Sequence, residues 1–348
     1  MKVGIVGLAG AGKTTIFNAL TGLRAETGPG GKRSEHMGVI KVPDERIDKL
    51  AAMHASKKLV FAEVTFVDVA AGPDLSAGKG ALPRPVIAAM QGCDALVLVL
   101  RAFANPGLAE GADALRDLRT LQAELILSDL GPLENRLERL KKEPGRPGEK
   151  ELLERCMAHL EGERPLGSLG LAPEQLQLLA GFGLLSIKPL LYLLNQEEAD
   201  FSGGIPPALA GQAEGLPLLA LSGKIEMDIA ELSPQEQPEF LAALGLERSA
   251  RDRFVQAAYG LLDLISFLTT GPDESRAWPI RRGTTAVKAA GRIHSDIERG
   301  FIRAEVIAYD ELVKLGGEKQ ARDAGKLRLE GKEYVVQDGD VIEFRFNV

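Results

Sequence analysis

Short runs of consecutive apolar residues recur along the first two thirds of the chain. They are bounded by glycine, proline or polar residues and separated by stretches of helical character, and they lie at Val3–Val6, Val60–Asp68, Ala95–Leu100, Leu190–Leu194 and Leu216–Leu221. Continuous rather than alternating apolar strands are buried on both faces, which is typical of a mostly parallel sheet flanked by helices. The pattern therefore predicts an α/β fold for this part of the chain.

A helical pattern separates the third of these runs from the fourth. Leucine and methionine recur there at intervals of three and four residues, at Leu118, Leu121, Leu125, Leu133, Leu137, Leu140, Leu153, Met157 and Leu160. The charged, Pro/Gly-rich stretch Lys141–Lys150 interrupts the stripe. We expect a protruding antiparallel helical hairpin. Its charges alternate in sign, which is typical of a solvent-exposed face.

The pattern changes again from Leu264 onward, where short β-rich segments surround one helix. The segments are Ile265–Thr270, Arg303–Tyr309, Tyr334–Val336 and Val341–Phe346, and the helix lies around Thr285–Arg299. Gln337–Asp340 has the composition of a turn between two strands. This part of the sequence predicts a compact α+β C-terminal domain.

The composition, 45% hydrophobic and 26% charged residues, is that of a soluble globular protein. The length of 348 residues is sufficient for two or three domains. The net charge of −7 argues against coating of nucleic acid or anionic membrane, although it permits a local basic patch. Two cysteines cannot form a disulfide framework, and no apolar run approaches the roughly 18–20 residues that span a bilayer. The N-terminus lacks a signal-peptide pattern. We expect a cytoplasmic protein with no membrane partner.

One glycine-rich motif carries the strongest chemical signal. Gly7–Thr14 reads GLAGAGKT and satisfies G-x-x-x-x-G-K-[ST], with a strand before it and a helix beginning near Lys13. Glycines let backbone N–H groups converge on phosphate oxygens, and the helix N-terminus adds partial positive charge. The predicted phosphate-binding residues are Gly10, Ala11, Gly12, Lys13, Thr14 and Thr15. Lys13 is the predicted catalytic residue at the β- and γ-phosphates, and Thr14 is a predicted Mg²⁺ ligand.

Further motifs follow the other predicted strands, and they make a family recognisable. They are Val67–Ala71 (VDVAA), Asn195–Glu198 (NQEE), Ser222–Lys224 (SGK), Ala277–Ala290, Ile293–Glu305 and Val336–Val348. With the phosphate-binding loop, the whole chain resembles YchF, an Obg-related P-loop NTPase. The resemblance implies a G domain in two parts (1–106 and 186–263), an inserted helical hairpin (107–185) and a ubiquitin-like α+β TGS domain (264–348).

The resemblance also implies roles for single residues. Asp68 corresponds to a second Mg²⁺-proximal residue, and Ser222 and Gly223 correspond to the S-A-K element of G domains. Asn195 and Glu198 match N-x-x-E, which replaces the guanine-reading N-K-x-D in YchF proteins, and these tend to favour ATP. Glutamate is one methylene longer than aspartate, so its bidentate match to guanine N1 and N2 is disturbed. An exposed residue at a helix start is the alternative for Glu198.

Phe103 falls where the family places an aromatic residue near the adenine. A core phenylalanine is an equal alternative at that position.

Several positions depart from the family pattern. Ala9–Ala11 replaces a Pro-Asn-Val triplet, which puts potassium-assisted chemistry in doubt, and Lys32 stands where a switch threonine would close over Mg²⁺ within the glycine-rich Thr27–Ser34. In the family a glycine N–H contacts the γ-phosphate. At that position this chain has Ala71, or Gly72 if the alignment is shifted by one residue. The family's next glycine-rich stretch is poorly retained in Leu75–Pro85. Hydrolysis needs a positioned water and charge stabilisation, and we identify no residue for the former, so we expect slow turnover.

Other candidate sites are weaker. His36, His54, His159 and His294 lack the spacing of a zinc site, and Cys93 is expected to be a packed thiol. A basic bias extends over Arg276, Arg281, Arg282, Lys288, Arg292, Arg299 and Arg303. Ordinary surface charge is one interpretation, and the resemblance favours contact with the ribosome or ribosomal RNA. Few aromatic residues interleave these positions, so base stacking on single strands is not supported, and no DNA specificity is expected.

The sequence thus favours an NTPase that binds ATP, or GTP second, with Mg²⁺ and associates with the ribosome. A nucleotide sensor without meaningful hydrolysis is the alternative within the fold. A P-loop small-molecule kinase is a third candidate, which the elements at Asn195–Glu198 and Ser222–Lys224 disfavour.

Overall fold

The computed structural model describes residues 1–25, 36–69, 83–143, 145–213, 215–233, 235–246 and 249–347. They form two compact units. The first unit comprises Met1–Val39 and Thr65–Ala258, and the second comprises Ile40–Val64 and Tyr259–Val348.

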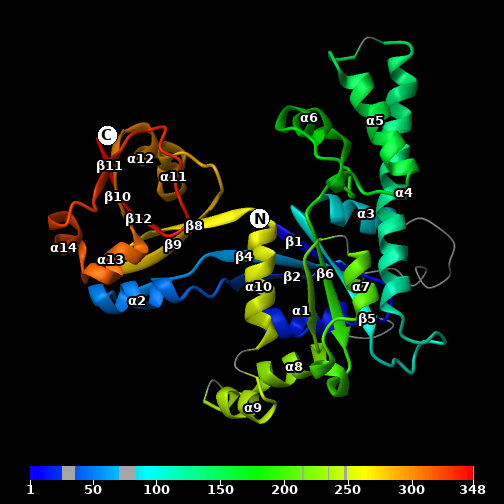
Figure 1. Ribbon diagram of the computed structural model, residues 1–348, viewed down its shortest axis with the longest axis horizontal. Coiled ribbons are helices and arrows are strands. Elements are labelled where there is room, and N and C mark those ends of the chain that lie inside the picture. The colour runs from blue at the N-terminus through cyan, green and yellow to red at the C-terminus, as the bar shows by residue number, and fades with distance from the viewer. Residues whose placement is uncertain are drawn as a thin grey trace. The chain divides into compact units, whose positions relative to one another are not determined.

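A six-stranded sheet with the order β2-β4-β1-β5-β6-β7 forms the centre of the first unit (Figure 1). The strands are β1 Lys2–Gly7, β2 His36–Lys41, β4 Glu63–Asp68, β5 Ala95–Ala102, β6 Leu190–Gln196 and β7 Leu218–Leu221. β1 is parallel to both β4 and β5, and β5–β6 and β6–β7 are also parallel pairs. The predicted α/β fold with a mostly parallel sheet is confirmed.

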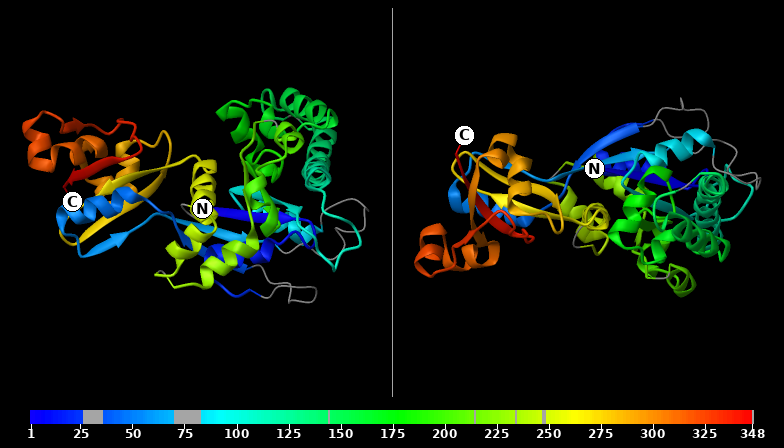
Figure 2. Two further views of the ribbon diagram at one scale, coloured as in Figure 1. Left: turned by 60° about the horizontal axis from the view of Figure 1, so that its bottom comes forward. Right: turned by 90° about the horizontal axis from the view of Figure 1, so that it is seen from above.

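Helices cover both faces of this sheet (Figure 2). Their bounds are α1 Lys13–Thr21, α3 Arg84–Gln91, α7 Pro207–Gln212, α8 Gly223–Glu231, α9 Gln237–Ala243 and α10 Ala250–Leu261. Leucines of β5 and β6 that point to one face form a buried cluster with side chains of α3, α7 and α4 (Ala114–Leu140). On the other face, Phe254 of α10 packs against Phe66 of β4 with ring centroids 5.5 Å apart. Burial on both faces explains why β5 and β6 read as unbroken apolar runs.

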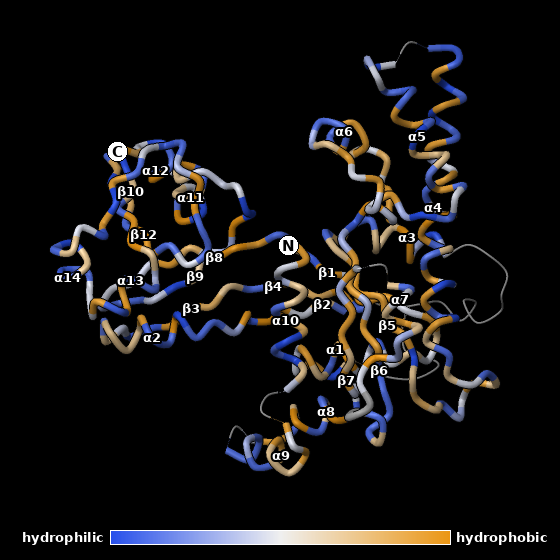
Figure 3. Tube along the Cα trace, viewed as in Figure 1, coloured by the Kyte–Doolittle hydropathy of each residue, from blue (hydrophilic) through white to orange (hydrophobic). Residues whose placement is uncertain are grey.

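The predicted helical hairpin is also confirmed. It consists of α4 Ala114–Leu140 and α5 Glu149–Glu161, followed by η2 Leu166–Ser168, α6 Pro173–Leu179 and η3 Ala180–Phe182. Hydrophilic and hydrophobic positions are interspersed along both long helices (Figure 3). Apolar side chains of the two helices form a buried cluster that is distinct from the one against the sheet. The buried carboxylate of Asp129 in α4 accepts hydrogen bonds from the N–H groups of Leu185 and Ser186, at 2.7 and 2.8 Å. These bonds fix the chain where it returns to the sheet.

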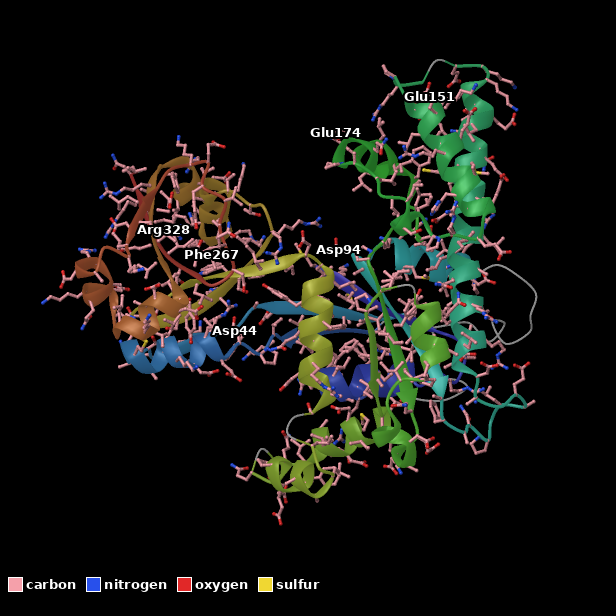
Figure 4. The ribbon with its side chains drawn as sticks, viewed as in Figure 1. Asp44, Asp94, Glu151, Glu174, Phe267 and Arg328 are labelled. Carbon is pink, nitrogen blue, oxygen red and sulfur yellow. The ribbon has the colours of Figure 1, made fainter. Side chains whose placement is uncertain are left out.

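The second unit contains a mixed sheet with the order β11-β10-β12-β8-β9-β3. Its strands are β3 Lys58–Val60, β8 Leu264–Thr269, β9 Glu274–Arg281, β10 Phe301–Ala308, β11 Arg328–Glu330 and β12 Asp340–Phe346. Its helices are α2 Glu45–His54, α11 Ala286–Ile293, α12 Ser295–Arg299, α13 Tyr309–Leu315 and α14 Glu318–Asp323. Phe267 of β8 lies in the core of this unit (Figure 4), with its ring stacked on Trp278 and in edge contact with Phe344.

Ile40–Val64 belongs to this second unit, whereas the sequence boundaries assigned it to the first part of the G domain (1–106). Asp44 is the N-cap residue of α2 (Figure 4), and Arg46 bonds both to Asp44 and, at 2.9 Å, to Asp338 in the turn before β12. Ser56 Oγ donates to the Gly271 carbonyl at 2.6 Å. These contacts join positions more than 200 residues apart, and no local pattern predicts them.

The prediction for the C-terminal domain lacks β9, β11, α13 and α14, and two of its elements are wrong. Tyr334–Val336 is not a strand, because only one isolated bridge links Val335 to Thr285. The single helix predicted over Thr285–Arg299 is two helices, α11 and α12, since His294 between them has extended backbone and its ring accepts the N–H of Asp296. Among the described helices, none is long and apolar enough to cross a membrane.

Candidate functional site

The predicted site residues of the first unit lie together at the carboxyl ends of its strands. The phosphate-binding loop follows β1, and Asp68 ends β4. Phe103 follows β5, Asn195 is the penultimate residue of β6, and Ser222 follows β7. Parallel strands end on the same side of a sheet, which is where ligands bind in α/β folds.

The backbone of the phosphate-binding loop has a geometry that only glycine adopts easily. Gly10 and Gly12 have φ of 73° and 83°, and α1 begins directly afterwards at Lys13. A Cβ atom built on Gly12 would lie 2.3 Å from Asn195 Nδ2, so this position has no space for a side chain. The Lys13 ammonium donates to the Leu8 carbonyl at 2.9 Å and thereby closes the loop. This arrangement exposes the N-terminus of a helix to an anion.

Thr14 and Asp68 form the oxygen-rich side of the site. Thr14 Oγ1 donates to Asp68 Oδ2 at 2.8 Å, and Asp68 Oδ1 is buried without a hydrogen-bond partner among the described residues. An unpaired buried carboxylate oxygen beside a hydroxyl suits a hard cation such as Mg²⁺. The described His, Cys, Asp and Glu residues form no group of three that could hold a metal ion. A cation at Thr14 and Asp68 would therefore need further ligands besides these described side chains.

Burial changes the ionisation of this side of the site. It lowers the pKa of Lys13 to about 8, although the charge of Asp68 opposes the shift. Burial also raises the pKa of Asp68, and the hydrogen bond from Thr14 and the charges of Lys13 and His36 act against that rise. Both groups are thus destabilised in their charged forms until a ligand compensates them.

Asn195 connects the loops on either side of the site. Its Nδ2 donates to the Ala11 carbonyl at 3.0 Å, and its Oδ1 accepts the N–H of Gly223 at 2.9 Å. The side chain is buried, and both of its polar atoms are used. Asn195 therefore fixes the spacing between the phosphate-binding loop and the start of α8, where Ser222 is the N-cap residue.

Glu198 begins the short 3₁₀-helix η4 Glu198–Gly203, which follows β6. Its Oε2 accepts a hydrogen bond from Lys224 Nζ at 2.9 Å. Lys224 is the second residue of α8, so the ion pair joins the segments that follow two neighbouring strands.

Phe103 lies beside the phosphate-binding loop, because its Cε1 atom is 3.6 Å from a Cβ built on Gly12. The loop that carries it is tied to both neighbours. Asn105 Nδ2 donates to the Gly10 carbonyl at 3.3 Å, and Glu197 Oε2 accepts the N–H of Ala104 at 3.2 Å. A wall of the site is thus formed by the segment between β5 and α4.

Sequence reasoning missed the contacts of Asn105, Glu197 and Lys224. The Asn-Pro-Gly turn at residues 105–107 was a signal that the chain reverses after β5, but it did not reveal which loop the asparagine touches. Thr15 lies half-buried in the first turn of α1, as expected from the motif. The switch positions Lys32, Ala71 and Gly72, with Thr27–Ser34 and most of Leu75–Pro85, fall outside the described residues.

The weaker candidates resolve as packing or surface residues. Cys93 is a packed thiol, as predicted, and its Sγ donates to the Ala89 carbonyl at 3.3 Å. His159 is buried and contacts Ser168 Oγ at 2.9 Å. In the basic region of the second unit, the Arg276 guanidinium lies 3.9 Å from the centre of the Trp278 ring.

The chain is similar to known proteins along its whole length. Residues 2–129 match a family model described as 50S ribosome-binding GTPase, and residues 264–347 match the C-terminal YchF-GTPase model, described as a protein of unknown function (DUF933). The chain is 40% identical to the ribosome-binding ATPase YchF of Haemophilus influenzae over 364 residues, which cover 100% of this chain and 99% of that protein. The chain belongs to the YchF family.

Further comparisons agree with this assignment. The Bacillus subtilis ribosome-binding ATPase YchF is 40% identical, with 100% of each chain covered, and Obg-like ATPase 1 of Oryza sativa subsp. japonica is 36% identical, with 100% of this chain and 92% of that protein covered. The structure of the Schizosaccharomyces pombe YchF GTPase has a TM-score of 0.87 and 29% identity, and covers 99% of this chain and 97% of that one. The family is one of nucleotide-binding P-loop proteins, and the fold of this member is theirs.

Proposed function

We propose that this chain binds ATP in preference to GTP, with Mg²⁺, and hydrolyses it slowly. The observation that carries the proposal is the position of Asn195, which is bonded to both the phosphate-binding loop and the start of α8. Glu198 begins η4 three residues after Asn195, and we assign the contact with the base to this glutamate, which stands where G domains have an aspartate.

The residues divide into a phosphate side and a base side. On the phosphate side, the loop N–H groups and the Lys13 ammonium bind the β- and γ-phosphates. Thr14 and Asp68 would hold Mg²⁺, which neutralises charge that develops on the phosphate oxygens. On the base side, Phe103 would contact the ring and Glu198 its polar edge.

Equilibrium binding of ATP, GTP and their hydrolysis-resistant analogues tests the base assignment. We expect ATP to bind more tightly, and we expect Glu198→Asp to shift the preference toward GTP. A wild-type preference for GTP would show that Glu198 does not select the base. Loss of all binding in Lys13→Ala is the control for use of this site.

Slow hydrolysis is proposed against a specific alternative, a nucleotide sensor without turnover. The sequence departures at Lys32 and Ala71 favour that alternative, because those positions serve Mg²⁺ closure and γ-phosphate contact in the family. Single-turnover phosphate release at stoichiometric protein distinguishes the two. Release above the Lys13→Ala background supports the hydrolase, and release at that background supports the sensor. Transfer of the γ-phosphate to a metabolite would instead indicate a small-molecule kinase.

We also propose that the chain acts at the ribosome, in the cytoplasm. The support is the name of the bacterial relatives, ribosome-binding ATPase YchF, together with the basic residues of the second unit. Co-sedimentation with ribosomes in the presence of an ATP analogue or of ADP tests this. Absence of the chain from the ribosomal pellet in both nucleotide states would refute it.

A further inference from the structure

Lys224 occupies a defined place at the base side of the site. Asn195 and Leu221 are register partners in β6 and β7, and the chain then continues on each side to Glu198 and Lys224. Gly223, the residue before Lys224, donates its N–H to Asn195 Oδ1, and this bond fixes the backbone next to Lys224. Lys224 Nζ and Glu198 Oε2 are 2.9 Å apart.

This ion pair changes which hydrogen bonds Glu198 can offer to a base. A free carboxylate presents two acceptor oxygens, which match the adjacent N1–H and N2–H donors of guanine. Adenine presents a different edge, with an N6–H donor beside the N1 acceptor. In the structure Oε2 is used by Lys224, and Oε1 has no partner in the part of the chain that the structure describes. An ammonium carries three donors, of which one is used here.

We propose that Lys224 is a base-specificity residue that selects adenine over guanine. By binding Oε2 it leaves Glu198 a single acceptor and places a donor beside it. An acceptor next to a donor is complementary to the N6 and N1 edge of adenine, whereas guanine needs two acceptors. The inference rests on the proposed binding of ATP at this site, and it assigns to Lys224 a role that the family motif N-x-x-E does not include.

The proposal differs from an ordinary surface ion pair in what it predicts. The side chains of Lys224 and Glu198 are 69% and 39% exposed. Exposed pairs contribute little to stability, so loss of this pair should leave the fold unchanged. The raised pKa of Lys224, caused by the hydrogen bond to Glu198, keeps the ammonium charged at neutral pH. The measurable consequence is therefore a change in the ratio of nucleotide affinities rather than in stability.

The experiment measures dissociation constants of ATP, GTP and inosine triphosphate with Mg²⁺ for the full chain and for Lys224→Met. Methionine keeps an unbranched side chain but removes the charge and the donors. Lys150→Met is the matched control, because Lys150 is 68% exposed and pairs with Glu154 in the helical hairpin, so the net charge changes equally. We expect Lys224→Met to lower the preference for ATP over GTP about two- to fivefold, the range of an exposed ion pair, and Lys150→Met to leave it unchanged.

Inosine triphosphate distinguishes the hydrogen-bond pattern from a general charge effect, since its base lacks the N2 amino group. We expect the wild type to bind GTP and inosine triphosphate alike, and Lys224→Met to favour GTP over inosine triphosphate.

The outcomes separate this inference from the function on which it rests. A wild type that prefers ATP, with the same preference in Lys224→Met, overturns the role of Lys224 alone. A wild type that prefers GTP, or binds no nucleotide, overturns the proposed function and this inference with it. Equal changes in Lys224→Met and Lys150→Met would also overturn the inference, because the effect would then come from net charge.

Discussion

Replacement of Asn195 by alanine should loosen two loops of the site at once. The side-chain amide makes two hydrogen bonds, one to the Ala11 carbonyl at 3.0 Å and one from the Gly223 N–H at 2.9 Å. Neither atom contacts solvent appreciably, since Asn195 is buried. The variant removes both bonds and leaves a carbonyl and an N–H group without their partner.

The size of the effect follows from these two bonds. Each contributes about 1 kcal/mol net, and each partner left unsatisfied in a buried place costs more, so the local loss is about 2–3 kcal/mol. Nucleotide binding must then order loops that the wild type holds in place. If that whole loss appears in binding, the dissociation constant for ATP rises about 30- to 150-fold.

Isothermal titration with an ATP analogue and Mg²⁺ measures this, with circular dichroism as the check on folding. Asn18→Ala is a closely matched control. Asn18 is equally buried, and its amide also makes two bonds, to the Ala25 carbonyl at 2.8 Å and from the Ala25 N–H at 2.9 Å. Asn18→Ala therefore loses two hydrogen bonds, as Asn195→Ala does, but at a position that does not join the phosphate-binding loop to α8. We expect a comparable loss of stability with a much smaller loss of affinity.

The reasoning would be refuted if Asn195→Ala bound the analogue within about threefold of the wild type, well below the range worked out above. It would also fail if Asn18→Ala lost affinity to the same extent. In either case the amide of Asn195 would stabilise the first unit without positioning the nucleotide loops.

Three further predictions concern other parts of the chain. The pKa of Lys13 is about 8 without ligand, and a bound triphosphate raises it. ATP affinity should therefore fall by up to about tenfold per pH unit above about pH 8, because binding then requires proton uptake, and Lys13→Arg should show no such fall; a flat wild-type profile from about pH 7 to about 9.5 would contradict this. Asp68→Asn should reduce the Mg²⁺-dependent gain in ATP affinity about tenfold while binding without Mg²⁺ changes little, and equal losses with and without Mg²⁺ would argue against Asp68 as a metal-side residue. Arg46→Met should destabilise the second unit by about 1 kcal/mol in urea, followed by fluorescence of Trp278, the one tryptophan, whereas Lys57→Met, whose ion pair is almost fully exposed, should have no effect.

The parts of the fold that could be predicted are those with a local signature. Apolar runs such as Ala95–Leu100 gave the parallel strands, because burial on both faces removes polar residues from them. The leucine stripe around Leu118–Leu125 predicted the hairpin for a different reason, because a helix that is buried on one side repeats its apolar residues every three or four positions. β2 and β9 were missed, since buried positions in His36–Lys41 and Glu274–Arg281 are interspersed with more exposed ones, and neither segment forms a continuous apolar run.

Long-range contacts account for the other differences. Ile40–Val64 joins the second unit through the bond between Arg46 and Asp338 and through the pairing of β3 with β9. Arginine and aspartate are common at surfaces, so neither residue marks a partner 292 positions away. The break at His294 is an exception with a local origin, because α11 ends where the His294 ring accepts the N–H of Asp296 and becomes the N-cap of α12.

The site was predictable on its phosphate side and only in part on its base side, and the reason is physical. Phosphate is bound largely by backbone, and the backbone conformation demands glycine at Gly10 and Gly12, which leaves a fixed spacing in the sequence. A base edge is bound by a few side chains that the fold brings together from separate strands. Glu198 could be recognised from its motif, but its pairing with Lys224 could not.

That division also determines how variants of this chain should behave. Changes at Lys13 or Asp68 act on groups that ATP and GTP share, so they should alter both affinities by the same factor. Changes at Glu198 or Lys224 act where the two nucleotides differ, so they should alter the ratio. Asn195 bonds to both sides through separate atoms, and the two effects can be separated there. Asn195→Asp keeps the acceptor for the Gly223 N–H but places an oxygen against the Ala11 carbonyl, so it should weaken ATP and GTP binding equally. A change in the ratio instead would show that the spacing of the phosphate-binding loop itself selects the base.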